Sequence, residues 1–216
     1  MENKKKDRSL AKETMDQCSI LYCTKDLPMT QTCMCWGWEC GSGWFNVLHE
    51  ASCKLEALNL IYYPKYKVRI QADQVKEKFG TLRFYFSVIC EDAERTKEQE
   101  VIMTAMNSWA DEIVRWAEDE CYKTCEECGH QIGENWSPRC ETLGWITYIC
   151  DTCAEKRGTL YIKNGEKWQG KTRLMTQEEV KAEHEEFERK WREKCEAEKD
   201  LGADVFEDKD KKDEEN

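Results

Sequence analysis

Hydrophobic residues recur at helical and strand spacings through the middle of the chain. Between residues 43 and 59, apolar side chains repeat every three or four positions, which predicts one amphipathic helix. Residues 66–72 and 81–89 instead alternate apolar and polar side chains, which predicts two β-strands. The run 75–80 extends the first strand into a turn at Gly80, so we expect the two strands to pair antiparallel.

A second helix follows the strands. Thr96 and Gln99 have the spacing of a capping box, and the next apolar residues step by four and three: Ile102, Met106, Trp109, Ile113 and Trp116. The order helix, strand, strand, helix predicts an α+β fold with two helices packed on a small antiparallel sheet. Residues 159–163 predict one more short strand, followed by a turn at Asn164-Gly165.

The C-terminal part is polar and acidic. A second capping box, Thr176 to Glu179, opens a long helix whose apolar stripe is thin: Val180, His184, Phe187, Trp191 and Cys195. Residues 176–216 hold 17 acidic and 9 basic side chains, so most of the formal charge of −11 lies there. We expect the last dozen residues to be disordered.

These patterns predict four parts of the chain. They are a flexible arm (1–17), an α+β core with a Cys- and Trp-rich start (18–121), a zinc-ribbon module (122–170), and an acidic helix with a disordered tail (171–216).

Composition narrows the class of protein. Of 216 residues, 40% are hydrophobic and 36% charged, and no apolar run approaches the roughly 18 residues of a membrane span. The first residues lack the apolar centre of a signal peptide, so we expect a cytoplasmic protein. A reducing compartment disfavours disulfides, which makes metal binding the better account of 14 cysteines.

Two Cys-x-x-Cys pairs provide the strongest chemical signal. The pair Cys125 and Cys128 is separated by 21 residues from the pair Cys150 and Cys153. Gly129 directly follows the first pair and gives its turn the conformational freedom of glycine. Four thiolates form the tetrahedral shell that zinc prefers, with no open position, so we expect one structural Zn²⁺. Nearby side chains rank below these as ligands: Cys121, Cys140 and His130.

The N-terminal cysteines are less regular. Cys18, Cys23, Cys33 and Cys35 could hold a second zinc, or could be small buried residues beside tryptophans. The sequence leaves this open, and it leaves the role of Cys40 open as well.

Three sequence motifs resemble those of a known family. Cys-Gly-Ser-Gly-Trp at 40–44, Gln-Val-Lys-Glu-Lys-Phe-Gly-Thr-Leu-Arg-Phe-Tyr at 74–85 and the Cys-x-x-Cys pairs together resemble small, uncharacterised proteins of bacterial and phage genomes. The resemblance covers roughly residues 39–153. It implies a phage origin but no established activity. The Cys-rich start and the acidic helix lie outside the residues that it covers.

Candidate chemistry outside the zinc ligands is sparse. His49 and Cys53 lie four residues apart on the first helix and could act as base and nucleophile, with Glu50 as an alternative acid or base. Because no third, orienting residue is identifiable, we interpret this pair as a partly buried helix face rather than an active site.

Two binding surfaces are candidates. Trp36, Trp38 and Trp44 could form an exposed hot spot or a lid over the sheet, and the Phe187/Trp191 stripe could dock on a protein. On the strands, a basic aromatic surface could bind nucleic acid: Lys76, Lys78, Arg83 and Tyr85. We expect a non-enzymatic, zinc-stabilised protein-interaction module, acting on a host protein as a phage accessory factor or inhibitor of host defence. The alternative is a nucleic-acid-binding zinc-ribbon protein.

Overall fold

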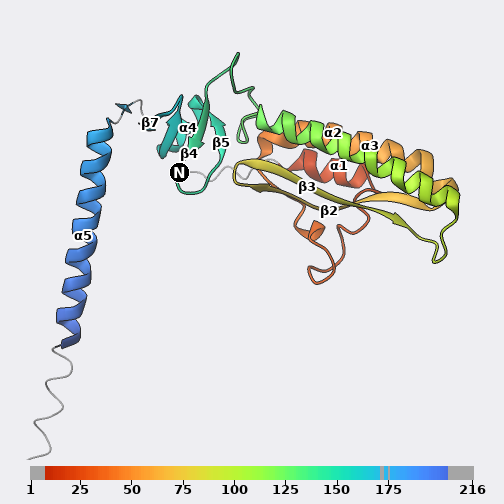
Figure 1. Cartoon of the computed structure of the whole chain (residues 1–216), viewed down its shortest axis with the longest axis horizontal. Helices are drawn as coiled ribbons and strands as arrows, with labels where there is room; N and C mark the ends of the chain where they lie inside the picture. The colour runs from red at the N-terminus through yellow and green to blue at the C-terminus, as the bar shows by residue number, and fades with distance from the viewer. Residues whose placement is uncertain (1–7, 171–172, 175, 204–216) are drawn as a thin grey trace, which may run out of the picture. The chain divides into compact units, whose positions relative to one another are not determined.

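The computed structural model describes residues 8–170, 173–174 and 176–203, which divide into two compact units with a boundary at residue 173 (Figure 1). The first unit has the predicted α+β class. It contains a mixed three-stranded sheet and, after it, a four-stranded antiparallel sheet that carries a cluster of four cysteines.

The first sheet is a long hairpin with a short third strand. Strands β2 (Val68–Lys78) and β3 (Thr81–Cys90) pair antiparallel, as predicted, with one register irregularity between Ala72 and Gln74. The two-residue strand β1 (Trp38–Glu39) adds to β2 in parallel. The sheet is therefore mixed, whereas the sequence predicted an antiparallel one, because two residues are too few to give an alternating pattern.

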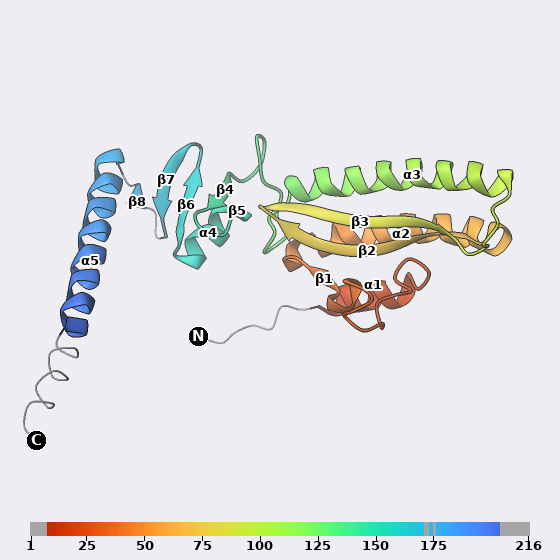
Figure 2. The same ribbon diagram turned by 60° about the horizontal axis from the view of Figure 1, so that its bottom comes forward.

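Two long helices pack side by side along the hairpin (Figure 2). Helix α2 (Phe45–Tyr66) is longer than predicted, whereas α3 (Lys97–Tyr122) begins at the expected capping box. There the Thr96 hydroxyl accepts from the Gln99 backbone, and the Gln99 side chain accepts from the Thr96 backbone. The alternating apolar residues of the strands face these helices and are buried: Val68, Ile70, Ala72, Val75, Leu82 and Phe84.

The N-terminal segment folds onto α2. Helix α1 (Ser9–Gln17) forms where we predicted a flexible arm, and it buries Ala11 and Thr14; residues 1–7 of that arm lie outside the described residues. The buried carboxylate of Glu56 on α2 accepts hydrogen bonds from the backbone N–H groups of Ile20 and Leu21, at 3.0 and 2.8 Å. These bonds fix the loop after α1, which continues into the single 3₁₀ turns η1 (Met34–Trp36) and η2 (Ser42–Trp44).

The second sheet belongs to the cysteine-rich part, for which we keep the name of the prediction, zinc-ribbon module (residues 122–170). Its strands run in the order β5-β4-β6-β7 and surround a separate apolar cluster that includes Ile132, Ile149 and Tyr161. The predicted strand at 159–163 forms with its turn. The elements are β4 (Arg139–Thr142), β5 (Tyr148–Cys150), α4 (Asp151–Arg157), β6 (Leu160–Lys163) and β7 (Glu166–Gln169).

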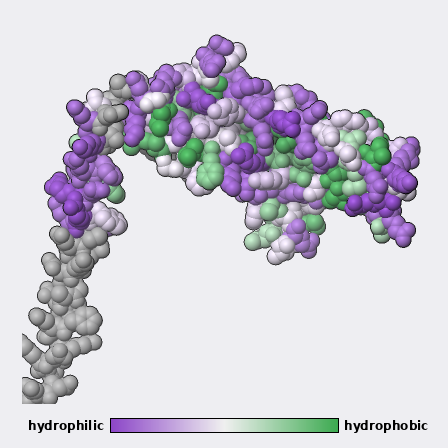
Figure 3. Space-filling view, viewed as in Figure 1, coloured by the Kyte–Doolittle hydropathy of each residue, from purple (hydrophilic) through white to green (hydrophobic). Residues whose placement is uncertain are grey.

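The second unit consists of β8 (Arg173–Leu174) and the long helix α5 (Gln177–Ala203), which begins directly after Thr176 as the second capping box predicted. Figure 3 shows that α5 is mostly hydrophilic. The Val180 and Cys195 side chains and the predicted disordered tail lie outside the described residues. No helix in the described ranges combines the length and apolarity that a membrane crossing requires.

Candidate metal centre

The first cysteine pair lies on a tight turn after α3. The Cys125 N–H donates to the His130 carbonyl at 2.7 Å, and the Gly129 N–H donates back to the Cys125 carbonyl at 2.9 Å. Gly129 has a φ of +75°, which glycine adopts without strain. The chain therefore reverses within a few residues, and both Cys125 and Cys128 point toward the same side.

The second pair spans a strand-to-helix junction. Cys150 is the last residue of β5, and Cys153 lies in the first turn of α4. Strand β5 is held in register by β4, where Arg139 pairs with Cys150. A regular strand and a regular helix turn thus position these two sulfurs.

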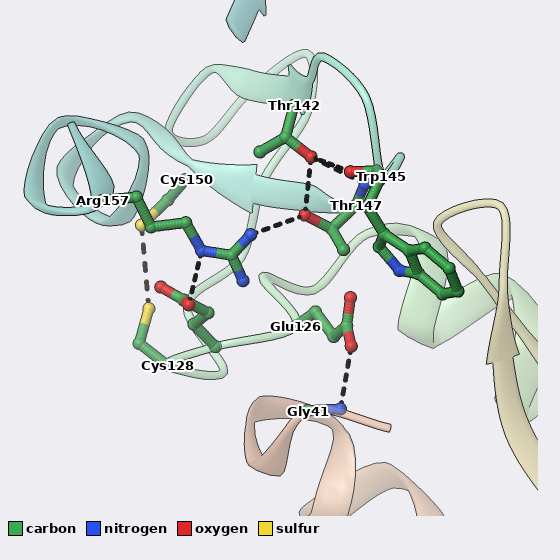
Figure 4. Close-up of polar contacts among 9 residues, drawn as sticks. Gly41, Glu126, Cys128, Thr142, Trp145, Thr147, Cys150 and Arg157 are labelled. Carbon is green, nitrogen blue, oxygen red and sulfur yellow. Dashed lines mark hydrogen bonds and ion pairs between the residues drawn. The ribbon is translucent and has the colours of Figure 1, made fainter. Parts of the chain in front are cut away.

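The four sulfur atoms all lie within 4.8 Å of one another. Figure 4 shows two of them, those of Cys128 and Cys150, which are 3.7 Å apart. A regular tetrahedron with zinc–sulfur bonds of about 2.3 Å has sulfur–sulfur edges of about 3.8 Å. A disulfide would need about 2.05 Å. The four residues predicted from spacing therefore form one group that fits a tetrahedral metal ion, with Cys128 at the solvent side and the other three buried.

The surroundings of the thiols differ in their effect on the pKa. Burial raises the pKa of Cys125 to about 11 and raises that of Cys153 further. Burial also acts on Cys128, but hydrogen bonds from the His130 backbone and the neighbouring thiols outweigh it and lower its pKa. Buried thiols retain their protons unless a cation compensates, so a divalent ion would displace protons on binding.

A shell of polar contacts ties the two turns together. The Arg157 guanidinium on α4 bonds Glu127, which lies between the first two cysteines, at 2.6 Å, and the Thr147 hydroxyl at 3.0 Å (Figure 4). The Thr147 backbone N–H and hydroxyl in turn contact the Thr142 hydroxyl on β4. These bonds hold both turns and the loop between β4 and β5 in one arrangement.

The cluster is also joined to the α+β core through backbone contacts that the sequence did not reveal. The Gly43 N–H donates to the Glu126 carbonyl at 2.8 Å, and the Gly41 N–H donates to the Glu126 carboxylate at 2.9 Å. The indole N–H of Trp44 donates to the Thr124 carbonyl at 2.9 Å. The Cys-Gly-Ser-Gly-Trp motif was the available signal for this junction, because paired glycines mark a close backbone approach.

Family models, curated proteins and solved structures yielded no match to this chain. The site is therefore interpreted from its own geometry.

The tryptophans predicted to form a hot spot separate into two groups. Trp38 and Trp44 are fully buried, and the Trp38 indole N–H donates to the Tyr22 hydroxyl at 3.1 Å, so neither ring is available to a partner. This corrects the exposed-cluster interpretation for both residues, which lie in the core instead. Trp36 remains about half exposed, and Phe187 and Trp191 on α5 are exposed by 65% and 59%.

The candidate basic surface lies on the outer face of the hairpin. Lys76, Lys78, Arg83 and Tyr85 alternate with the buried residues of β2 and β3, and Lys76 is directly opposite Arg83 in the register. The pattern of alternation therefore placed these four side chains on one face.

The N-terminal cysteines do not come together as a ligand set. Among the described residues, the group around Cys125 is the only one with three or more clustered metal-ligating side chains. Instead, the Cys23 thiol contacts the Gln71 side chain and the Cys35 thiol contacts the Thr32 carbonyl, while Cys18 is buried.

His49 has an orienting partner that spacing could not show. The Thr14 hydroxyl donates its proton to the Leu10 carbonyl, so it must accept from His49 Nδ1, which lies 2.8 Å away. However, the Cys53 sulfur is 3.8 Å from Nε2 and 4.0 Å from Nδ1, and a sulfur almost equidistant from both nitrogens lies in line with the lone pair of neither.

Proposed function

We propose that the protein is a non-enzymatic, zinc-stabilised protein-interaction module. The four clustered sulfurs support the zinc part of this proposal, because thiolates are soft ligands and their spacing matches a zinc–sulfur tetrahedron. Four protein ligands complete the shell and leave no position for a reacting water. Zinc in such a site is a structural cross-link that supplies about 10 kcal/mol or more of folding free energy.

One observation carries the interaction part. Helix α5 keeps Phe187 and Trp191 exposed on one face, four residues apart, although both rings would gain from burial. An amphipathic helix with two large anchors is a standard element for docking into an apolar groove. Because its segment is strongly acidic, we infer a partner whose groove has a basic rim.

The partner in this proposal is a host protein. The resemblance to phage proteins favours a factor that acts inside an infected cell, and a helix that occupies a basic groove would block a defence protein or a nucleic-acid enzyme of the host. The contacts of His49 and Cys53 do not support an enzyme, since neither ring nitrogen is aimed at the sulfur.

The zinc proposal is tested by metal analysis of the purified full-length chain. We expect one zinc per chain, lost in Cys150→Ser together with the fold of the zinc-ribbon module. Cys140→Ser is the matched control, because Cys140 is equally buried in the same module but lies outside the cluster. Equal zinc content in both variants would refute the ligand assignment.

The interaction proposal is tested by capture of a partner from nuclease-treated host lysate. Phe187→Glu and Trp191→Glu should each abolish capture. Arg189→Ala is the control, because it is two residues from each ring and thus lies on the opposite face of α5. Capture that survives loss of both rings would refute the role of α5 while leaving the zinc proposal intact.

A further inference from the structure

The tip of the hairpin contains an aromatic residue that folding does not explain. Phe79 and Gly80 connect β2 to β3 with φ values of +53° and +76°, the geometry of a type I′ turn. Asparagine, aspartate and glycine suit the first of these positions, whereas a bulky residue is strained there. Phe79 is also 68% exposed, so its ring gains little from burial.

This turn is seated against the zinc-ribbon module. A Cβ atom on Gly80 would lie 2.8 Å from the Tyr148 ring, so only glycine permits this approach. Beside the contact, the hairpin tip and the β4–β5 loop enclose a groove of about 430 Å³, lined by Phe79, Trp145 and Ile146 together with Lys76 and Lys78. Both sides of the groove therefore belong to the same compact unit.

Trp145 presents a second exposed ring to the groove. Its side chain is 77% exposed, yet its indole N–H donates to the Glu77 carboxylate at 3.1 Å, which orients the ring. The other oxygen of Glu77 accepts from the Gly80 backbone N–H at 2.6 Å. Both oxygens of this carboxylate are thus engaged in positioning the turn and the tryptophan.

The cations beside the groove are not held in ion pairs, although carboxylates lie near two of them: Glu39 is opposite Lys76 in the β1–β2 register, and Glu118 interacts with the charge of Arg83. Lys76 and Arg83 are directly opposite each other in the β2–β3 register, a like-charge pairing that weakens a sheet. Within the described part of the chain, neither they nor Lys78 form an ion pair with a carboxylate. An anionic ligand would relieve this repulsion.

We propose that this groove binds single-stranded nucleic acid. Bases stack on Phe79 and Trp145, while phosphates contact Lys76, Lys78 and Arg83. Exposed rings beside cations on two neighbouring strands, Lys76 and Lys78 on β2 and Arg83 on β3, suit this ligand, because every base offers a face for stacking. A duplex would have to unstack its bases to reach the rings. An acidic peptide would satisfy the cations, but it would not use the two aromatic planes.

The number of cations limits the strength of the salt dependence. Two or three phosphate contacts to a single strand give a slope of about −1.4 to −2.1 for the logarithm of affinity against the logarithm of salt concentration. Raising the salt from about 50 to 200 mM should therefore weaken binding roughly 7- to 18-fold. The net acidity of the chain favours a short contact rather than wrapping of a long strand.

The test is fluorescence anisotropy of labelled 12-nucleotide single-stranded RNA and DNA with the full-length, zinc-loaded protein. Phe79→Asn is the decisive variant, because asparagine suits the left-handed turn and should preserve or improve the stability of the hairpin. We expect it to weaken binding at least fivefold, the lower end of what one stacked base contributes. Lys76→Gln should weaken binding and make the salt slope shallower by about 0.7.

Trp136→Ala is the matched control, since Trp136 is an exposed tryptophan of the same module that does not line the groove. It should bind like the unchanged protein. The proposal is overturned if Phe79→Asn binds as tightly as the unchanged protein, if a duplex of the same length binds better, or if polyglutamate competes as well as the oligonucleotide. Each result is independent of α5, so it is distinguishable from failure of the protein-interaction proposal.

Discussion

Replacing Gly43 by alanine tests whether the metal centre and the α+β core are one structural unit. A Cβ atom at this position would lie 2.2 Å from the Cys125 carbonyl oxygen and 2.5 Å from the Gly129 nitrogen. Both of these atoms belong to backbone, so no side chain can rotate away. The two segments would have to separate by about 1 Å to restore normal contacts.

Separation removes specific hydrogen bonds. The Gly43 N–H would leave the Glu126 carbonyl, and the buried Trp44 indole would leave the Thr124 carbonyl. Each buried donor left without a partner costs about 1 to 3 kcal/mol. We therefore expect Gly43→Ala to lower the free energy of unfolding by about 2 to 6 kcal/mol. Zinc affinity should fall about 10- to 100-fold, as for other contacts that support metal ligands.

The direction of the change in unfolding free energy distinguishes a close junction from a loose one. Gly43 does not have a positive φ, so alanine would be neutral or stabilising by about 0.4 to 1 kcal/mol if the junction were loose, because it restricts the unfolded chain. Denaturant unfolding monitored by tryptophan fluorescence, with Ser42→Ala as control for the same loop, measures the difference. A Gly43→Ala protein as stable as the Ser42→Ala protein would refute the close backbone approach.

Two further predictions concern the core. Burial, with smaller contributions from Cys53 and Glu56, raises the pKa of the Cys18 thiol from 9.0 to about 12, so its contribution to stability is complete below pH 9 and is lost as the pH rises toward 12. Unfolding free energies measured between pH 8 and 11 should fall less steeply in Cys18→Ala, and an unchanged slope would contradict this assignment. Glu56→Gln should cost about 2 to 4 kcal/mol, because the amide group would face a backbone N–H of the loop after α1. Glu50→Gln, an exposed change on the same helix, should be nearly neutral, and equal midpoints for the two variants in a urea titration would argue against a structural role for Glu56.

Local patterns in the sequence predicted the elements whose causes are local. The capping box at Thr96 and Gln99 forms as expected because its two hydrogen bonds join residues three apart. The spacing of the cysteine pairs predicted the four-sulfur group for a similar reason, since each pair needs only one short turn. The alternation along β2 and β3 likewise separated the inner from the outer face of the hairpin.

The features that the sequence did not reveal depend on distant partners. Helix α1 has an apolar face formed by Leu10, Ala11 and Met15, but it is only nine residues long and lies in a highly charged segment, so its contacts with α2 could not be predicted and a flexible arm was expected. Tryptophan is common in surface hot spots, but the indole N–H of Trp44 donates a hydrogen bond inside the protein, to a carbonyl 80 residues later in the chain. The groove at Phe79 also could not be predicted, because Trp145 reaches it from the loop between β4 and β5, far away in the sequence.

Gly41 and Glu126 contact each other but lie far apart in the sequence, and this affects how the protein folds during its synthesis. Gly41 leaves the ribosome 85 residues before its acceptor, and the second cysteine pair follows later still. A nascent chain that ends with α3 therefore has all the helices and strands of the core, but the donors of Gly41, Gly43 and Trp44 still lack their acceptors. Cys153, the last residue of the four-sulfur group, is made after this stage, so the first-made half of the unit depends on the last-made half for its completion.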